Sequence, residues 1–103
     1  MDHVTTTCRS VGAFSLRQHA EHLLSQWGKL YEHLPSMGAR TIETVLGGYA
    51  LEDADRWVGR IADIAYLAGL SGGDKMSLTI EDAHSMRMVE ESLGRAKHTL
   101  GAS

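Results

Sequence analysis

Residues 15–34 read SLRQHAEHLLSQWGKLYEHL, and this stretch decides the class of fold. Its apolar residues recur at alternating steps of four and three, which places them along one side of an α-helix. They are Leu16, Ala20, Leu23, Trp27, Leu30 and Leu34. Ser15 is a suitable N-cap, and Pro35 lacks an amide hydrogen and restricts the residue before it. The spacing therefore predicts a helix over residues 16–34.

Two later stretches repeat the same period. The first predicts a helix over residues 50–68, with the apolar series Ala50, Ala54, Trp57, Ile61, Ile64 and Ala68. Gly69 and the pair Gly72-Gly73 should end it. The second predicts a helix over residues 80–99, opened by Thr79 and Asp82 as a capping-box variant, with the apolar series Met86, Val89, Leu93, Ala96 and Leu100.

A shorter apolar segment lies between the first two long stretches. In residues 37–46, Ile42, Val45 and Leu46 can line one side of two or three helical turns, and Gly47-Gly48 should end them. Long segments that share a seven-residue period can keep their apolar sides facing one another. We therefore predict an all-α fold, a small helical bundle of three long helices plus one short helix.

The beginning of the chain differs from the rest. Residues 1–14, MDHVTTTCRSVGAF, are rich in threonine and show no helical period. We expect residues 1–14 to form a mobile N-terminal arm and residues 15–103 to form a single helical domain, since 103 residues leave no room for a second core.

Composition limits the compartment and the class of partner. Ten Lys and Arg against thirteen Asp and Glu give a net charge of −3, which does not favour nonspecific binding to a phosphate backbone. A single cysteine, Cys8, excludes an intramolecular disulfide and fits a reducing compartment. The chain has no apolar run of about 18 residues and no signal-peptide pattern at its start. We expect a soluble cytoplasmic protein with no membrane contact.

The sequence offers no pattern typical of catalysis. Neither Gly47-Gly48 nor Gly72-Gly73 has the spacing of a phosphate-binding or dinucleotide-binding loop. No glycine-framed nucleophile accompanies the serines and histidines. We therefore predict that the protein is not an enzyme, has no catalytic residues and uses no cofactor.

A few histidines have spacings that occur in metal sites. His19 and His22 lie three apart on the first predicted helix, and Glu81 and His84 form Glu-x-x-His on the last. Further ligands are not identifiable nearby, so we expect histidines on solvated helix faces and no metal. A metal-binding helical bundle is kept as an alternative.

One local stretch resembles a DNA-binding motif. Residues 61–71, IADIAYLAGLS, resemble the first helix and turn of helix-turn-helix repressors, where small residues and a glycine allow close packing. The resemblance implies that residues 72–77 form the recognition helix. These residues open with two glycines and carry only Lys75 as a cation. A helix-turn-helix regulator that binds nucleic acid through residues 61–77 is therefore a second alternative.

A wider resemblance concerns a family of phage regulators. Residues 23–29, LLSQWGK, followed by Pro35-Ser36, resemble the opening of phage late-gene antitermination proteins of the Q type. Residues 78–83, LTIEDA, with residues 89–93 downstream, are similar to the acidic capped helix of that family. The resemblance implies a phage regulator of bacterial transcription.

Small size and the lack of a catalytic pattern favour a protein that acts by binding. We predict a regulatory or inhibitory protein, of phage or mobile-element type, that binds a protein partner and self-associates. We call the apolar series of each long helix its seam. The candidate contact residues are two tryptophans of these seams, Met88, which lies outside the seam of its helix and should be exposed, and three arginines for an acidic partner. They are Trp27, Trp57, Met88, Arg56, Arg60 and Arg87.

Overall fold

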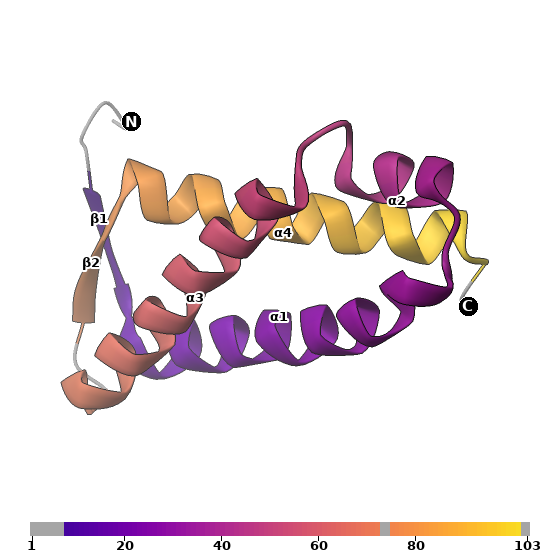
Figure 1. The fold of residues 1–103 in the computed structure, drawn as a ribbon. Coiled ribbons are helices and arrows are strands. Elements are labelled where there is room, and N and C mark those ends of the chain that lie inside the picture. Colours follow the sequence, from indigo (N-terminus) through magenta and orange to yellow (C-terminus); the bar gives the residue numbers. More distant parts are fainter. Residues whose placement is uncertain (1–7, 73–74, 102–103) are drawn as a thin grey trace.

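The computed structural model describes residues 8–72 and 75–101, and these form a helical bundle with a short β-ribbon at one end (Figure 1). The elements in chain order are β1 (Cys8–Gly12), α1 (Ala13–His33), the 3₁₀ turn η1 (Leu34–Ser36), α2 (Ala39–Leu46), α3 (Leu51–Ser71), β2 (Lys75–Thr79) and α4 (Ile80–Thr99). The predicted all-α bundle of three long helices and one short helix is confirmed.

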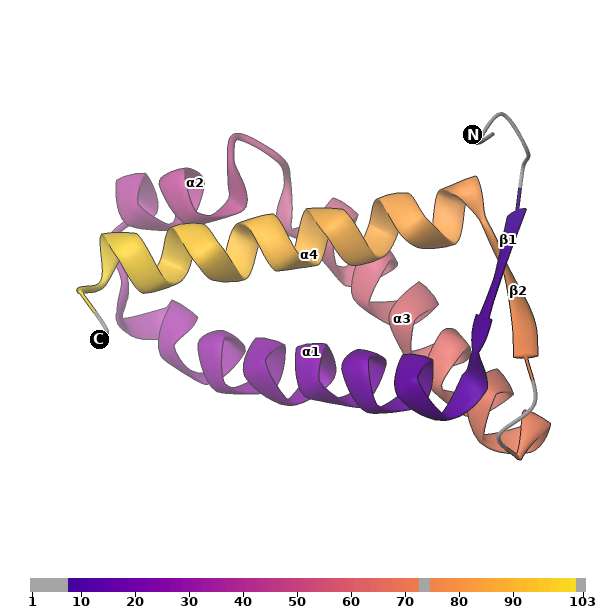
Figure 2. The ribbon, with the colours of Figure 1, turned by 180° about the vertical axis from the view of Figure 1, so that it is seen from behind.

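The ribbon separates the starts of two long helices. β1 and β2 pair antiparallel, with Cys8 opposite Thr79 and Gly12 opposite Lys75. Because β1 leads into α1 and β2 leads into α4, these helices begin at opposite ends of the ribbon, about 13 Å apart at the usual rise of a strand. α1 and α4 then run in the same direction away from the ribbon, and α3 runs back against both (Figures 1 and 2). α2 packs on α4.

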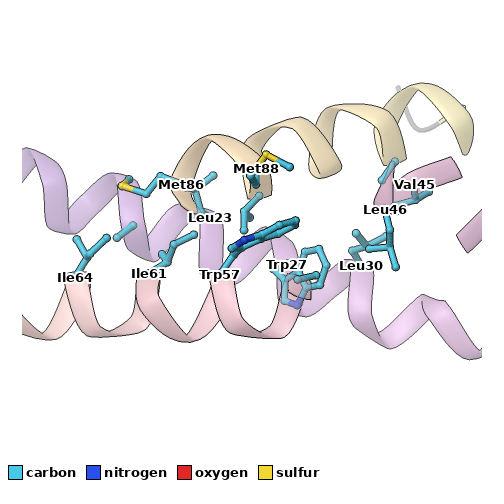
Figure 3. Close-up of a cluster of buried hydrophobic side chains, with 14 of the residues drawn as sticks. Leu23, Trp27, Leu30, Val45, Leu46, Trp57, Ile61, Ile64, Met86 and Met88 are labelled. Carbon is cyan, nitrogen blue, oxygen red and sulfur yellow. The ribbon is translucent and has the colours of Figure 1, made fainter. Parts of the chain in front are cut away.

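The apolar seams predicted from the sequence form the core. The five seam residues of α1 are buried, and so are Leu34 in η1 and the seam residues of α3 from Ala54 to Ala68. Figure 3 shows part of this cluster, with Trp27 from α1 and Trp57 from α3 both inside it. Ala50 is the exception, because it is the exposed N-cap residue of α3.

α4 buries a wider side than its seam predicts. Besides Met86, Val89 and Ala96, it buries Ser85, Met88 and Ser92. The prediction that Met88 is exposed is wrong, since its side chain is 6% exposed and belongs to the core cluster (Figure 3). The reason is that α4 contacts three helices, α1, α2 and α3. Residues of α4 outside its seam therefore also face a neighbouring helix.

The ends of the helices agree with the prediction to within two residues except at the start of α1 and the end of α3. Thr79 and Asp82 form the expected capping box, and α1 ends at His33 before Pro35. However, α1 begins at Ala13 with Gly12 as N-cap, because β1 leads directly into it, so Ser15 lies inside the helix. α3 continues through Gly69 and ends at Gly72, which has a left-handed φ of 63°.

The ribbon itself was not predicted. Two five-residue strands are too short to show a clear alternation, and their pairing joins segments that are far apart in the chain. In β2, Leu78 is buried while Lys75 and Thr79 are exposed, so one face of the ribbon covers the core. The segment expected to be a mobile arm thus contains a paired strand at Cys8–Gly12. Residues 1–7 lie outside the described residues.

Arg95 fixes the end of α2. Its Nε donates a hydrogen bond to the carbonyl oxygen of Val45 at 2.9 Å, and its Nη2 donates to Ser92 Oγ at 3.0 Å. Gly47 ends α2 with a φ of 67°, and a Cβ at that position would lie 2.6 Å from Arg95 Nη2. The turn after α2 therefore favours glycine for its left-handed φ, and a side chain there would also have to displace the end of the Arg95 side chain.

We expect Gly47→Ala to destabilise the protein by about 2–4 kcal/mol, combining left-handed strain with the displacement of Arg95. Urea unfolding followed by circular dichroism measures this loss. The matched control is Gly48→Ala, which has a φ of 84° but open space around its Cβ. If the two variants lose equal stability, the contact with Arg95 contributes nothing.

Candidate functional site

A hollow lies between α1 and α4, on their halves distant from the ribbon. We call it the α1–α4 groove. Its volume is about 490 Å³, within the range of ligand-binding pockets. It is lined by His19, His22, Leu23, Gln26, Lys29, Leu30, His33, Glu90, Leu93, Gly94, Ala96, Lys97 and Leu100.

The polar wall of the groove is a stripe along α1. His19, His22, Gln26, Lys29 and His33 follow one another at steps of three, four, three and four, the spacing that keeps side chains on one helix face. This stripe runs beside the buried seam of the same helix. Three of its five side chains are imidazoles and one is an ammonium group.

The floor of the groove is apolar. Leu23, Leu30 and Ala96 are buried at its base, and Leu93 is half-buried. Leu100, a seam residue predicted to be covered, is 44% exposed at the end of α4. Gly94 lowers the α4 wall, because it has no side chain and nothing lies within 4 Å of a Cβ built there. The groove therefore has space for apolar side chains from outside.

One hydrogen-bonded contact crosses between the two walls. His19 Nε2 lies 2.5 Å from Glu90 Oε2, and both side chains are more than 40% exposed. Exposed pairs of this kind contribute about 0–1 kcal/mol to stability. Glu90 is the sole acidic residue in the lining, and the lining also contains Lys29 and Lys97. The rim is therefore locally positive although the chain carries a net charge of −3.

None of the six predicted contact residues lines this groove. Trp27 and Trp57 are buried in the core, where the ring of Trp57 meets Tyr49 edge-on at 5.1 Å. Met88 is buried as described above. These three side chains are engaged in the interior of the protein.

The three predicted arginines lie on the surface but do not share one role. Arg56 is exposed and pairs with Asp53 one turn earlier. Arg87 is exposed on α4. Arg60 joins α3 to the start of α4, donating to Asp82 Oδ1 at 3.0 Å with Glu81 at 3.6 Å. The hydrogen bond with Asp82 raises the pKa of the Arg60 guanidinium, burial opposes the rise, and the charge of Glu81 adds to it.

The helix-turn-helix interpretation lacks its second helix. Residues 61–71 lie within the continuous helix α3, and Lys75–Thr79 form a strand where the recognition helix should begin. The left-handed turn at Gly72 directs the chain back along β1. The element implied for DNA reading is therefore not formed at residues 75–77, and residues 73–74 lie outside the described residues.

Of the histidines with metal-site spacing, His19 and His22 both line the α1–α4 groove, whereas His84 lies near the start of α4. His19 pairs with Glu90, and the ring of His84 lies edge-on to Trp57 at 6.3 Å. Over residues 8–72 and 75–101, no three His, Cys, Asp or Glu side chains are grouped so that they could hold a metal ion.

The polar residues that line the groove on α1 already form a regular pattern in the sequence. The polar series from His19 to His33 has the same seven-residue period as the seam beside it. What the sequence did not reveal is that α4 supplies the opposite wall.

In the described ranges, no helix has the length and apolar character needed to cross a bilayer. In comparisons with known proteins, no family model matches the chain, and no curated protein and no solved structure matches it.

Proposed function

We propose that this protein is a small non-enzymatic regulatory or inhibitory protein that binds a protein partner through the α1–α4 groove. The partner segment is an amphipathic helix whose polar face carries carboxylates. The observation that carries the proposal is the groove itself, with an apolar floor and a rim of Lys29, Lys97 and three histidines.

The shape of the groove supports a helical occupant. From His19 to His33 it follows α1 for about 21 Å at the usual helical rise, which is the length of four turns. Proteins that bind a partner helix lay its apolar face into a hydrophobic groove, where side chains at helical spacing act as anchors. A volume of about 490 Å³ suits such anchors, with the helix backbone outside the groove.

Charge supports an acidic occupant. Glu90 is already paired with His19, whereas neither Lys29 nor Lys97 forms an ion pair with any described residue. Complementary charges at the rim of an interface accelerate association and exclude partners of the wrong sign. Carboxylates flanking the apolar anchors would meet these two ammonium groups.

A phage or mobile-element regulator that targets bacterial transcription is the specific form of this proposal. It is supported by the resemblance of residues 23–29 with Pro35-Ser36, and of residues 78–83 with residues 89–93, to Q-type antitermination proteins. The groove is formed in part by the first of these segments, because Leu23, Gln26 and Lys29 line it.

The test uses a fluorescently labelled amphipathic peptide with leucines on one face and glutamates on the other. We expect its fluorescence anisotropy to rise on binding, and the double variant Lys29→Glu/Lys97→Glu to weaken binding at least about tenfold, or about 1.4 kcal/mol. Arg56→Glu/Arg87→Glu is the matched control, because it changes the net charge equally outside the groove. If the arginine double variant weakens peptide binding and the lysine double variant does not, the peptide does not bind in the groove.

A second variant fills the groove without changing its charge. Gly94→Phe should block the peptide, and Gly59→Phe should not, because Gly59 lies on α3 outside the groove with equally open space at its Cβ. A peptide with lysines in place of glutamates should bind much more weakly. Equal binding of the two peptides, or no binding of the glutamate peptide at millimolar concentration, would contradict the proposed occupant.

A further inference from the structure

The α1–α4 groove has a carboxylate near one end and ammonium groups toward the other. His19 Nε2 lies 2.5 Å from Glu90 Oε2, so this contact aligns the two walls at the end nearer the ribbon. α1 and α4 run in the same direction from there (Figures 1 and 2). At the usual helical rise, Lys29 lies about 15 Å and Lys97 about 10 Å further along their helices. We call the end at Glu90 the near end and the end at the two lysines the far end.

Charged residues just outside the lining preserve this difference. Beside Glu90, α4 carries the exposed residues Glu91 and Arg87, whose charges are opposite. Beside Lys29, α1 carries the exposed Glu32. None of these three neighbours lines the groove. With the imidazoles uncharged, counting the neighbours still leaves the near end negative and the far end positive.

The backbone of both walls is polarised along the same axis. α1 ends at His33 and α4 at Thr99, and both of these ends lie at the far end of the groove (Figure 2). The C-terminal end of a helix carries a partial negative charge, and the N-terminal end carries a partial positive charge. A bound helix is therefore most stable with its N-terminus at the far end, antiparallel to α1 and α4.

Side-chain charge favours the same direction. Acidic residues stabilise the first turn of a helix, and basic residues stabilise its last turn. In an antiparallel partner, first-turn carboxylates would lie beside Lys29 and Lys97, and a basic last turn would lie beside Glu90. A partner that bound in the opposite direction would place its carboxylates beside Glu90 and its basic residues beside the lysines.

We propose that the groove selects its partner helix by direction. The helix binds antiparallel to α1 and α4, with an acidic first turn at the far end and a basic last turn at the near end. This inference rests on the proposed function, and it adds the direction and the charge order of the occupant. A groove whose charges were evenly distributed would leave both open.

Two labelled peptides of identical composition test the charge order. Both carry leucines along one face, and one has glutamates in its first two turns and lysines in its last two turns. The other has the glutamates and lysines exchanged. We expect the first peptide to bind the full chain at least about fivefold more tightly, measured by fluorescence anisotropy.

A charge swap in the protein separates the groove from the peptide, because the exchanged peptide is also the weaker helix former. Glu90→Lys/Lys97→Glu keeps the net charge and should lower the ratio of the two affinities at least about threefold. The matched control is Arg17→Glu/Glu21→Arg, which reverses an ion pair of α1 outside the groove and should leave the ratio unchanged. Circular dichroism verifies that both swapped proteins keep their helices.

A nitroxide label on the first peptide reports the direction in the wild-type protein. At the N-terminus of the peptide it should broaden the NMR amide signals of Lys97 and Thr99, and at the C-terminus those of His19 and Glu90. The proposed direction is wrong if the peptides bind but the two labels give the reverse pattern or broaden both ends alike. It is also wrong if Glu90→Lys/Lys97→Glu leaves the affinity ratio unchanged. If neither peptide binds at millimolar concentration, the proposed function itself fails, and the direction fails with it.

Discussion

Met88→Lys is expected to unfold the protein. The side chain of Met88 is 6% exposed in a cluster of apolar residues, and the described structure places no carboxylate in that cluster. An ammonium group moved there loses its hydration without gaining a partner, at a cost of several kcal/mol. Since the whole free energy of unfolding of a domain is about 5–15 kcal/mol, little stability would remain.

Circular dichroism at 222 nm and its thermal melting curve measure this loss. The matched control is Met88→Leu, which conserves volume and polarity and should cost less than about 1.5 kcal/mol. A Met88→Lys variant with a wild-type melting temperature would show that Met88 is an exposed side chain, as its off-seam position first suggested.

Trp57→Ala is expected to lower the free energy of unfolding by about 3–5 kcal/mol, the usual range for truncating a buried aromatic side chain. Trp57 is 8% exposed, and its indole ring meets Tyr49 and His84 edge-on. Removing it leaves a cavity where α3 and α4 meet.

Urea unfolding gives the difference, and the control lies one residue away. Arg56→Ala removes an exposed side chain whose pairing with Asp53 stays within one helix, so its effect should remain within about 0.5 kcal/mol. Both residues were predicted partner contacts. Equal and small effects of the two substitutions would show that Trp57 is not a core residue.

The sequence predicted most of the fold because apolar periodicity is a local property. The seam of α1 could be read from Leu16 to Leu34, and the N-cap of α4 from Thr79 and Asp82. Burial of Met88 could not be read in this way. It depends on how many neighbours α4 has, and a single period shows only that a helix has one buried side.

The candidate site was less predictable for a related reason. His19 and His22 stood out as a spaced pair, but the partner of His19 is Glu90, 71 residues further on. Likewise the pairing of β1 with β2 is a long-range contact between two short segments. The groove and the ribbon are both formed by segments that are far apart in the sequence. A local sequence pattern cannot predict which distant segments will lie side by side.

The antiparallel ribbon also limits how this architecture can change. Lengthening both strands by two residues would move the start of α4 away from the start of α1 by about 7 Å, at the usual rise per residue. That is most of the distance between two packed helix axes, about 8–10 Å, so α3 could no longer touch both neighbours. Insertions or deletions in β1 or β2 would therefore have to be matched by larger or smaller side chains along α3.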